Sequence, residues 1–296
     1  MSTNNITCAN CGKGEEISGD LKACTACKMV KYCNRECQIA HRPQHKKLCK
    51  KRAVELYDEK LFKETPREEC PICMLTLPLY ETHQTTTGVT FHSCCGKRIC
   101  HGCICAMAES GVKDLCAYCR TPPENSDEEI IKRVEKLMER GNPNAFNHFA
   151  GYYEDGTMGL TQDNAKANEL YLKAGELGCA TAYYNLGNAY RLGRGVEVDK
   201  KKAKHCYELG AINGHVYARH NLGGLEGQTG NFKRAMKHLL ISARAGCKKS
   251  LDLVMGGYKD GFVTKEEYAN ALRECQKSQD EMKSDARDKA VIILND

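Results

Sequence analysis

The stretch GCATAYYNLGNAYRLGRGVEVDKKKAKHCYELGAINGHVYA, residues 178–218, contains the pattern that decides most of this fold. It holds two copies of a motif in which a glycine is followed four positions later by a small residue. Two further copies flank them, so the motif begins four times, at Gly141, Gly178, Gly214 and Gly246. A period of about 35 residues is typical of stacked pairs of helices, each of which can bury its apolar face only against its neighbours. The sequence therefore predicts a helical repeat array over its second half.

One unit of this array resembles a known repeat family. The residues that carry the resemblance are Asn185-Leu186-Gly187-Asn188-Ala189-Tyr190, Gly193-x-Gly195-Val196 and Asp199-x-x-x-Ala203. They are similar to the Sel-one-like repeat, a relative of the tetratricopeptide repeat. The resemblance covers residues 141–282 and implies an α/α solenoid of about four units, which would hold a protein partner on its concave surface. We interpret the recurring tyrosines and the single cysteines of this region as core packing.

The cysteines are placed unevenly along the 296 residues. Of 20 cysteines, 16 lie between Cys8 and Cys119. The polar N-terminus, Met1–Asn5, has no apolar signal core, and no stretch is long and apolar enough to suggest a membrane span. We therefore expect a cytoplasmic or nuclear chain in a reducing compartment, where Cys-x-x-Cys pairs indicate metal ligands rather than disulfides.

The formal net charge of +6 would by itself suggest a nucleic-acid partner. Cysteines that bind zinc are thiolates, however. Seven thiolates with two Zn²⁺ lower the charge of the first cysteine cluster by 3, and eight thiolates with two Zn²⁺ lower that of the second by 4. The zinc-loaded protein would then carry about −1, so a nucleic-acid partner is not expected. The lysines and arginines around Lys50-Lys51-Arg52 are interpreted as a solvated face.

The first cluster offers eight potential zinc ligands within about 40 residues. They are Cys8, Cys11, Cys24, Cys27, Cys33, Cys37, His45 and Cys49. Short loops such as Cys-x-x-Cys turn two thiolates toward one ion, and an i, i+4 spacing places two ligands on one face of a helix. A segment this short cannot bury enough apolar surface to fold alone, so zinc, worth about 10–16 kcal/mol per structural site in small peptides, would decide its folding.

This spacing, together with the runs at 32–38 and 45–49, resembles the MYND zinc finger. The resemblance implies an interleaved arrangement, in which Cys8, Cys11, Cys33 and Cys37 hold one ion and Cys24, Cys27, His45 and Cys49 hold the other. Members of that family often bind short proline-containing peptides through a Gln and a Trp on the last helix. Gln38 matches the Gln and is a candidate partner-binding residue, whereas Arg42 stands at the Trp position and removes the aromatic surface for a proline ring.

The second cluster begins at Cys70-Pro71-Ile72-Cys73 and contains Cys94, Cys95, Cys100, Cys103, Cys116 and Cys119. It looks like the all-cysteine variant of a RING-type finger. That resemblance implies a cross-braced fold, with one zinc held by Cys70, Cys73, Cys100 and Cys103 and a second held by Cys116, Cys119 and a pair from the Cys94–Cys95 region. Adjacent ligands are unusual, and His92 is the alternative to Cys94. His101 and Cys105 are expected not to be ligands.

RING-type fingers commonly recruit a ubiquitin-conjugating enzyme, and two residues here match the positions used for it. Ile72 is the apolar residue between the first two ligands, and Arg120 is the cation after the last ligand. Against this, the chain has no Trp for the usual aromatic contact, and Ala117 replaces the usual Pro. Ligase activity and a purely structural finger are both compatible with the sequence, and no residue for covalent catalysis is evident.

These patterns predict a mainly α protein, in which two small zinc-stabilised modules precede an α/α solenoid. The expected segments are a MYND-type finger at 1–52, a helical linker at 53–69, a RING-like finger at 70–123, a linker helix at 124–140, the repeats at 141–282 and a tail at 283–296. About four zinc ions are expected per chain. The predicted function is a zinc-binding protein-interaction scaffold; the alternative is a non-catalytic adaptor or a transcription-related zinc-finger protein. The apolar tail would dock on the last repeat or fray.

Overall fold

Residues 7–14, 20–64, 67–79, 88–111 and 115–295 are described by the computed structural model, and they divide into two units, 1–63 and 64–296. The polar N-terminus at 1–5 lies outside the described residues. The fold is mainly α, with cysteine-rich modules followed by a helical solenoid, which confirms the predicted fold class. No helix in the described part of the chain is long and apolar enough to cross a membrane.

The first unit contains a two-stranded ribbon and one long helix. Strands β1 (Lys22–Ala23) and β2 (Lys31–Tyr32) pair antiparallel, and α2 (Arg35–Leu61) follows directly. Asn34 begins this helix by accepting a hydrogen bond from the backbone N–H of Cys37 at 2.8 Å, as expected of an N-cap asparagine. The helix runs for 27 residues, so the first part of the predicted helical linker, 53–61, continues the last helix of the finger.

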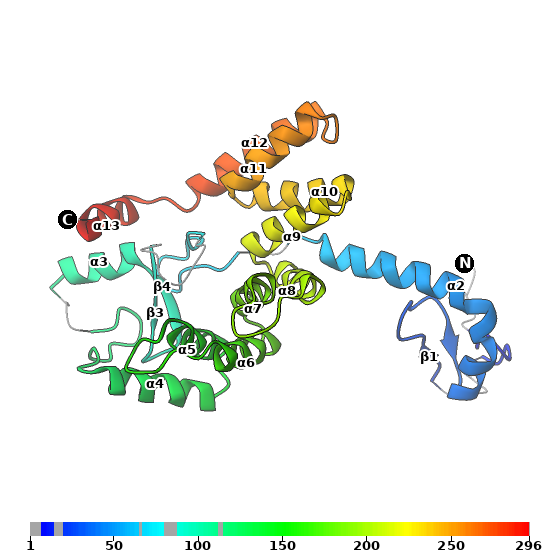
Figure 1. Cartoon of the computed structure of the whole chain (residues 1–296), viewed down its shortest axis with the longest axis horizontal. Helices are drawn as coiled ribbons and strands as arrows, with labels where there is room; N and C mark the ends of the chain where they lie inside the picture. Colours follow the sequence, from blue (N-terminus) through cyan, green and yellow to red (C-terminus); the bar gives the residue numbers. More distant parts are fainter. Residues whose placement is uncertain (1–6, 15–19, 65–66, 80–87, 112–114, 296) are drawn as a thin grey trace. The chain divides into compact units, whose positions relative to one another are not determined.

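The second unit begins with the second cysteine cluster, which is built on a hairpin and a short helix (Figure 1). Strands β3 (Val89–His92) and β4 (Lys97–Cys100) pair antiparallel, with Val89 opposite Cys100 and His92 opposite Lys97. Helix α3 (His101–Glu109) starts where β4 ends. The hairpin and α3 thereby place cysteines from both ends of β4 into one small module.

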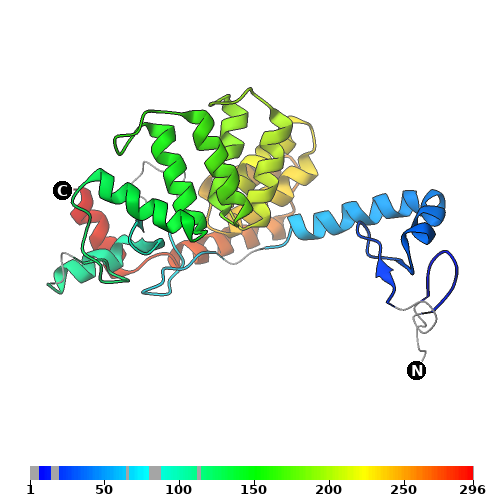
Figure 2. The same ribbon diagram turned by 90° about the horizontal axis from the view of Figure 1, so that it is seen from below.

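The solenoid follows, introduced by α4 (Asp127–Glu139), whose N-cap Ser126 accepts a hydrogen bond from the N–H of Glu129 at 3.3 Å. Successive helices then pack as antiparallel neighbours, which Figure 2 shows as a stack of helix pairs. The pairs are α5 (Pro143–Asp155) with α6 (Asn164–Glu176), α7 (Ala180–Leu192) with α8 (Lys200–Ile212), α9 (Val216–Gln228) with α10 (Phe232–Arg244), and α11 (Lys248–Lys259) with α12 (Lys265–Asp280). A last helix, α13 (Asp285–Asn295), ends the described chain.

The glycine and the small residue of the repeat motif have separate structural roles. Each motif glycine has a positive φ, from +74° at Gly141 to +101° at Gly178, and so turns the chain between one pair and the next. The small residue four positions later lies in the first turn of the next helix and is completely buried in all four units, as Ala145, Ala182, Ala218 and Ser250. A larger side chain would hold neighbouring helices apart, which explains why the motif recurs.

Glycines inside the helices let aromatic rings approach the backbone. A Cβ added at Gly187 of α7 would lie 2.5 Å from Cε1 of Tyr207 on α8, a ring that is itself completely buried. At Gly224 of α9, by contrast, an added Cβ would meet nothing within 4 Å. The first glycine is required by packing, and the second is not.

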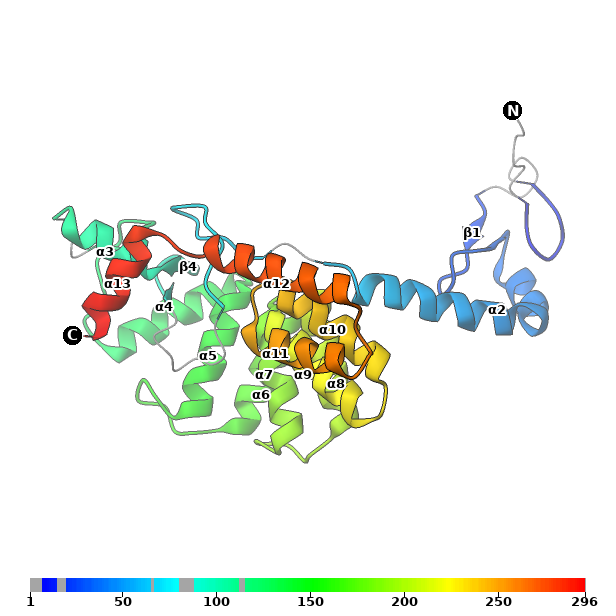
Figure 3. The same ribbon diagram turned by 90° about the horizontal axis from the view of Figure 1, so that it is seen from above.

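The second cysteine cluster and the solenoid are fixed to each other within the second unit. The ring of Phe91 on β3 stacks on that of His148 on α5, with centroids 4.1 Å apart. Arg67 donates to the backbone carbonyls of Ala245 and Ser278, at 3.3 and 3.4 Å. Figure 3 shows α13 beside α3 rather than on the last repeat, and the two helices are in contact. The chain thus returns from the end of the repeats to the cysteine-rich module.

We predict opposite effects for the same substitution at two helical glycines. Gly187→Ala should lower the free energy of unfolding by about 1–2 kcal/mol, because overpacking against Tyr207 exceeds the gain in helix propensity. Gly224→Ala should raise it by about 0.5–1 kcal/mol, because only the propensity gain remains. Urea denaturation followed by circular dichroism measures both. A stabilising Gly187→Ala would mean that α7 and α8 do not pack as described.

Candidate metal centres

Four groups of side chains bring four potential ligand atoms each within 4.8 Å of one another. Two lie in the first unit and two in the second, and each has the tetrahedral number of donors that structural zinc requires. The groups are Cys8, Cys11, Cys33 and Cys37; Cys24, Cys27, His45 and Cys49; Cys70, Cys73, Cys100 and Cys103; and Cys94, Cys95, Cys116 and Cys119. The structure therefore brings together every residue that the sequence analysis proposed as a ligand.

The distances between sulfur atoms fit zinc and exclude disulfides. Four thiolates held tetrahedrally about 2.3 Å from a zinc ion lie about 3.8 Å from one another, whereas a disulfide joins its sulfurs at about 2.05 Å. Measured separations run from 3.4 Å, between Cys94 and Cys119, to 4.0 Å, between Cys95 and Cys116. The donor sets are thus spaced for an ion between them.

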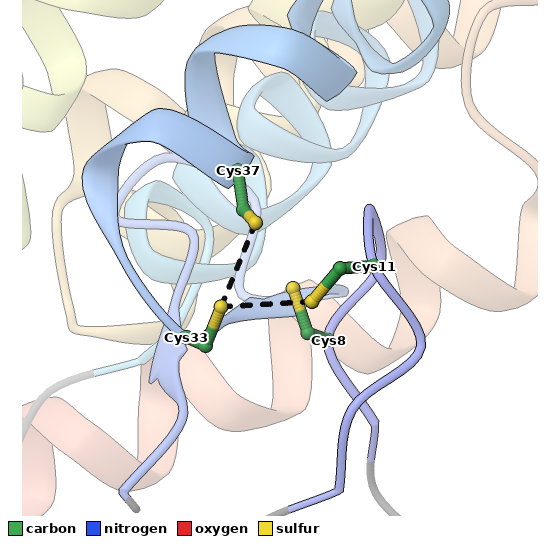
Figure 4. Close-up of side chains that lie close together, drawn as sticks. All are labelled: Cys8, Cys11, Cys33 and Cys37. Carbon is green, nitrogen blue, oxygen red and sulfur yellow. Dashed lines mark hydrogen bonds between the residues drawn. The ribbon is translucent and has the colours of Figure 1, made fainter. Parts of the chain in front are cut away.

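The first group of the finger draws its thiols from three separate pieces of chain (Figure 4). Cys8 and Cys11 come from the N-terminal loop, Cys33 from the residue after β2, and Cys37 from the first turn of α2. The Cys33 sulfur lies 3.7 Å from that of Cys11 and 3.5 Å from that of Cys37. One ion at this point would join the loop, the ribbon and the helix.

The second group of the finger combines the β1–β2 turn with α2. The sulfurs of Cys24 and Cys49 are 3.7 Å apart, and Nε2 of His45 lies 3.2 Å from the Cys27 sulfur. His41 stands outside the group but stacks on His45, with ring centroids 5.6 Å apart, and its Nδ1 is hydrogen-bonded to the hydroxyl of Tyr32 at 3.0 Å. His41 therefore supports the orientation of His45, a role that the sequence spacing did not indicate.

Four of the five Cys-x-x-Cys pairs, all but the one at the start of α3, share one backbone geometry. The residue after the second cysteine has a left-handed φ near +60 to +70°, and its N–H donates to the carbonyl of the first cysteine at 2.9–3.0 Å. These residues are Gly12, Lys28, Met74 and Arg120. Three of the four are not glycine, so the loops hold a conformation that is unfavourable for their own side chains. Such strain persists only where the surroundings enforce it, which agrees with metal-bound loops.

The electrostatics of the groups also favour a cation. Burial raises the pKa of the Cys8 thiol, but backbone N–H donors from Cys11, Cys33 and Asn10 outweigh it and bring the pKa to about 6. Burial is outweighed by hydrogen bonds in the same way at Cys24, whose pKa falls to about 6, and at Cys70, whose pKa falls to about 7. At Cys119 burial again raises the pKa, and the side-chain hydrogen bond with Thr121 contributes most to lowering it to about 7. Each group thus holds one thiol that ionises readily.

Two other thiols of the finger, those of Cys33 and Cys49, have raised pKa values. The hydrogen bond with Cys37, together with burial, raises the pKa of Cys33 to about 12, and burial with the adjacent thiol of Cys24 raises that of Cys49 to about 11. Several thiolates within 4 Å repel one another, and a divalent cation removes that cost. The donor sets therefore fit zinc, and the chain carries a zinc-binding finger.

The pair Cys94 and Cys95 lies in the turn of the β3–β4 hairpin. The N–H of Gly96 donates to the carbonyl of His92 at 2.8 Å, and Gly96 has a φ of +69°. This tight turn directs both adjacent sulfurs into the same group, which resolves the geometric difficulty of neighbouring ligands. The His92 ring lies outside the group, and burial lowers its pKa. His101 instead contacts the hydroxyl of Thr90 at 3.0 Å.

The three proposed partner-binding residues occupy two different surfaces. Gln38 lines a groove of about 500 Å³ on the finger, together with Ile39 and Arg42 of α2. Ile72 is 39% exposed in the first loop of the second module, and Arg120 is exposed after its last loop. The Arg120 guanidinium lies 3.0 Å from the sulfur of Met107, a weak acceptor that leaves it available to a partner.

The fold and these centres define a zinc-finger protein with a helical-repeat solenoid, and comparisons with known families agree. Residues 8–49 match the family model described as MYND finger. Residues 147–179, 180–215 and 216–247 match the Sel1 repeat, the family named Sel-one-like above. Both resemblances are thereby confirmed. The RING-like character of 70–123 rests on its spacing and geometry and remains a prediction.

Solved structures similar to this chain include a Sel1 repeat protein from Oxalobacter formigenes, at 27% identity over 52% of this chain and 63% of that chain, with a TM-score of 0.42. Another is c5321 from uropathogenic Escherichia coli, a protective antigen displaying an SLR fold, at 22% identity over 61% and 41% of the two chains, with a TM-score of 0.47. A third is the immunity protein Pa5087 from Pseudomonas aeruginosa, at 21% identity over 59% and 66%, with a TM-score of 0.37. The chain spans less than two thirds of the length of each. No curated protein matches it significantly.

We predict that metal analysis of the purified protein gives about four zinc ions per chain, two for each module. Cys24→Ser should lower this number and abolish folding of the first finger, while the thermal transition of the repeats persists, because the finger has little core without metal. Cys105→Ser is the matched control, since its thiol belongs to none of the four groups, and should leave the zinc content unchanged. Two or fewer zinc ions in the unsubstituted protein would show that one module does not bind metal as proposed.

Proposed function

We propose that this protein is a zinc-dependent interaction scaffold, in which the repeats hold a protein partner and the second module recruits a ubiquitin-conjugating enzyme. The observation that carries the proposal is the attachment of that module to the solenoid. Two kinds of contact link the two parts within one unit: Phe91 stacks on His148, and Arg67 donates to backbone carbonyls at the ends of α10 and α12. An enzyme on the module and a partner on the repeats would then stand at a constant separation.

Such a protein accelerates transfer of ubiquitin without covalent chemistry of its own. Holding two reactants in a productive geometry converts a bimolecular step into an effectively unimolecular one, which is the largest effect available to a scaffold. Two proposed zinc ions fix the loops that present Ile72 and Arg120. One is held by Cys70, Cys73, Cys100 and Cys103, and the other by Cys94, Cys95, Cys116 and Cys119. Ile72 supplies apolar contact to the enzyme, and Arg120 supplies a hydrogen-bond donor to its ubiquitin.

The finger at the N-terminus adds a second interaction surface to the scaffold. In its groove, Gln38 provides an amide that pairs with the backbone of an extended segment, and Arg42 replaces the aromatic residue that a proline-rich segment would need. We therefore assign Gln38 to partner binding, with a partner that differs from the proline-containing peptides of the family.

Discharge of ubiquitin from a panel of charged conjugating enzymes tests this function. The full chain should accelerate discharge with at least one enzyme, and Ile72→Ala and Arg120→Ala should each reduce that acceleration about tenfold, the effect of losing about 1.4 kcal/mol of contact. Leu272→Ala and Arg273→Ala, at exposed positions of α12, are matched controls and should have no effect.

The same experiment separates the two functions that the sequence leaves open. If the zinc-loaded full chain accelerates no enzyme of a broad panel, the protein is a non-catalytic adaptor. If acceleration occurs but is insensitive to both Ile72→Ala and Arg120→Ala, the enzyme binds elsewhere, and the assignment of these two residues is wrong.

A further inference from the structure

The C-terminal helix α13 packs against α3 of the second cysteine-rich module, although about 175 residues of chain separate the two (Figure 3). Gly102 of α3 is the point of closest approach. A Cβ added there would lie 2.8 Å from the backbone nitrogen of Arg287 and 3.0 Å from the carbonyl carbon of Ala286. The backbones of the two helices therefore touch, and they do so between Cys100 and Cys103, two of the proposed ligands.

From this contact, Arg287 reaches the Cys70–Cys73 loop. Its Nη1 donates to the carbonyl of Thr76 at 2.7 Å, and its Nη2 donates to the carbonyl of Leu75 at 3.2 Å and lies 3.6 Å from the sulfur of Cys73. Nη1 also donates to the carbonyl of Met282 at 2.7 Å, which joins the connection between α12 and α13 to the same guanidinium. The residue is only 7% exposed.

A buried guanidinium in this position affects both the charge and the geometry of a four-thiolate centre. Zinc with four thiolates carries a net charge of −2, and a cation beside the sulfurs of Cys73 and Cys100 offsets part of it. The rigid fork of the guanidinium also joins the successive carbonyls of Leu75 and Thr76, just after the loop, which fixes the direction of the Cys73 side chain. A lysine would supply the charge but not the fork.

We propose that α13 is an integral part of the second zinc module, and that Arg287 is a positioning residue for its first metal centre, acting through Cys73. The module is then discontinuous in sequence and is closed by a helix that follows the repeats. It also follows that zinc binding at this centre and docking of α13 on α3 are linked. Bound zinc stabilises the docked helix, and the docked helix stabilises bound zinc by the same free energy. The proposal does not depend on recruitment of a conjugating enzyme.

Zinc release to a chromophoric chelator, measured on the full chain, tests the role of Arg287. Removing a side chain that supports a metal ligand typically costs 10–100-fold in metal affinity, so Arg287→Ala should release one zinc about tenfold faster or more, with the other ions unaffected. Arg287→Lys should release this zinc at a rate between those of Arg287→Ala and the unsubstituted protein. Lys289→Ala removes an exposed cation on the same helix and should release zinc at the rate of the unsubstituted protein. Alkylation of Cys73, mapped by mass spectrometry, should rise in parallel.

Three results would overturn the proposal. Equal release rates for Arg287→Ala and Lys289→Ala would show that Arg287 does not support the centre. Equal acceleration of all zinc ions by Arg287→Ala would show general unfolding instead of a local effect. Faster release without greater alkylation of Cys73 would place the effect at another ligand.

Hydrogen exchange on the unsubstituted protein tests the linkage without any variant. Chelation of zinc should remove protection from the amides of α13, whereas those of α7 and α8 stay protected. Gly102→Ala should have a similar effect in the zinc-loaded protein, because its methyl group separates the helices, although alanine alone would favour α3. Unchanged protection of α13 after zinc removal would contradict the linkage.

Discussion

The structure depends first on the mutual repulsion of crowded thiolates and its relief by a divalent cation. The buried residues that form the core of the finger are Cys8, Leu21, Cys24, Cys27 and Tyr32, and those of the second module are Cys70, Leu77, Ile99, Cys100 and Cys116. Three of the five in each are proposed ligands, so without metal there is almost no apolar core to hold either module. Zinc therefore takes the place of hydrophobic burial in the N-terminal part of the chain.

The solenoid obeys a different constraint, the close approach of helices at small residues. Ala182 and Ala218 are completely buried at equivalent positions, and Gly187 accommodates the ring of Tyr207. Because each helix pair contacts mainly its neighbours, the stability of this part is a sum of local terms. The cysteines of the repeats, such as Cys206, whose pKa burial raises to about 11, are ordinary apolar residues of this packing.

Arginines join the two kinds of structure within the second unit. Arg67 and Arg287 each donate to more than one backbone carbonyl, the first at the ends of α10 and α12 and the second at Leu75 and Thr76, just after the Cys70–Cys73 loop. A planar donor with five N–H groups suits such positions, since it satisfies several acceptors left open where helices and loops end. These bonds convert a zinc module and a repeat array into one unit, which is what a scaffold with a fixed geometry requires.

The sequence by itself determined the finger at 8–49, the repeat array and the list of candidate ligands, because ligand spacing and repeat period are local properties of the chain. The grouping of those ligands around each ion came from the family resemblances. The sequence also showed that the glycine motif recurs at Gly141, Gly178, Gly214 and Gly246. It did not distinguish His92 from Cys94, because the choice depends on a hairpin turn that directs two adjacent sulfurs to one side. The sequence also did not indicate that His41 supports His45 or that α13 packs against α3. Contacts such as Arg287 with Leu75 join residues more than 200 positions apart, and only the tertiary structure decides them, since no short-range pattern records which distant backbone groups will meet.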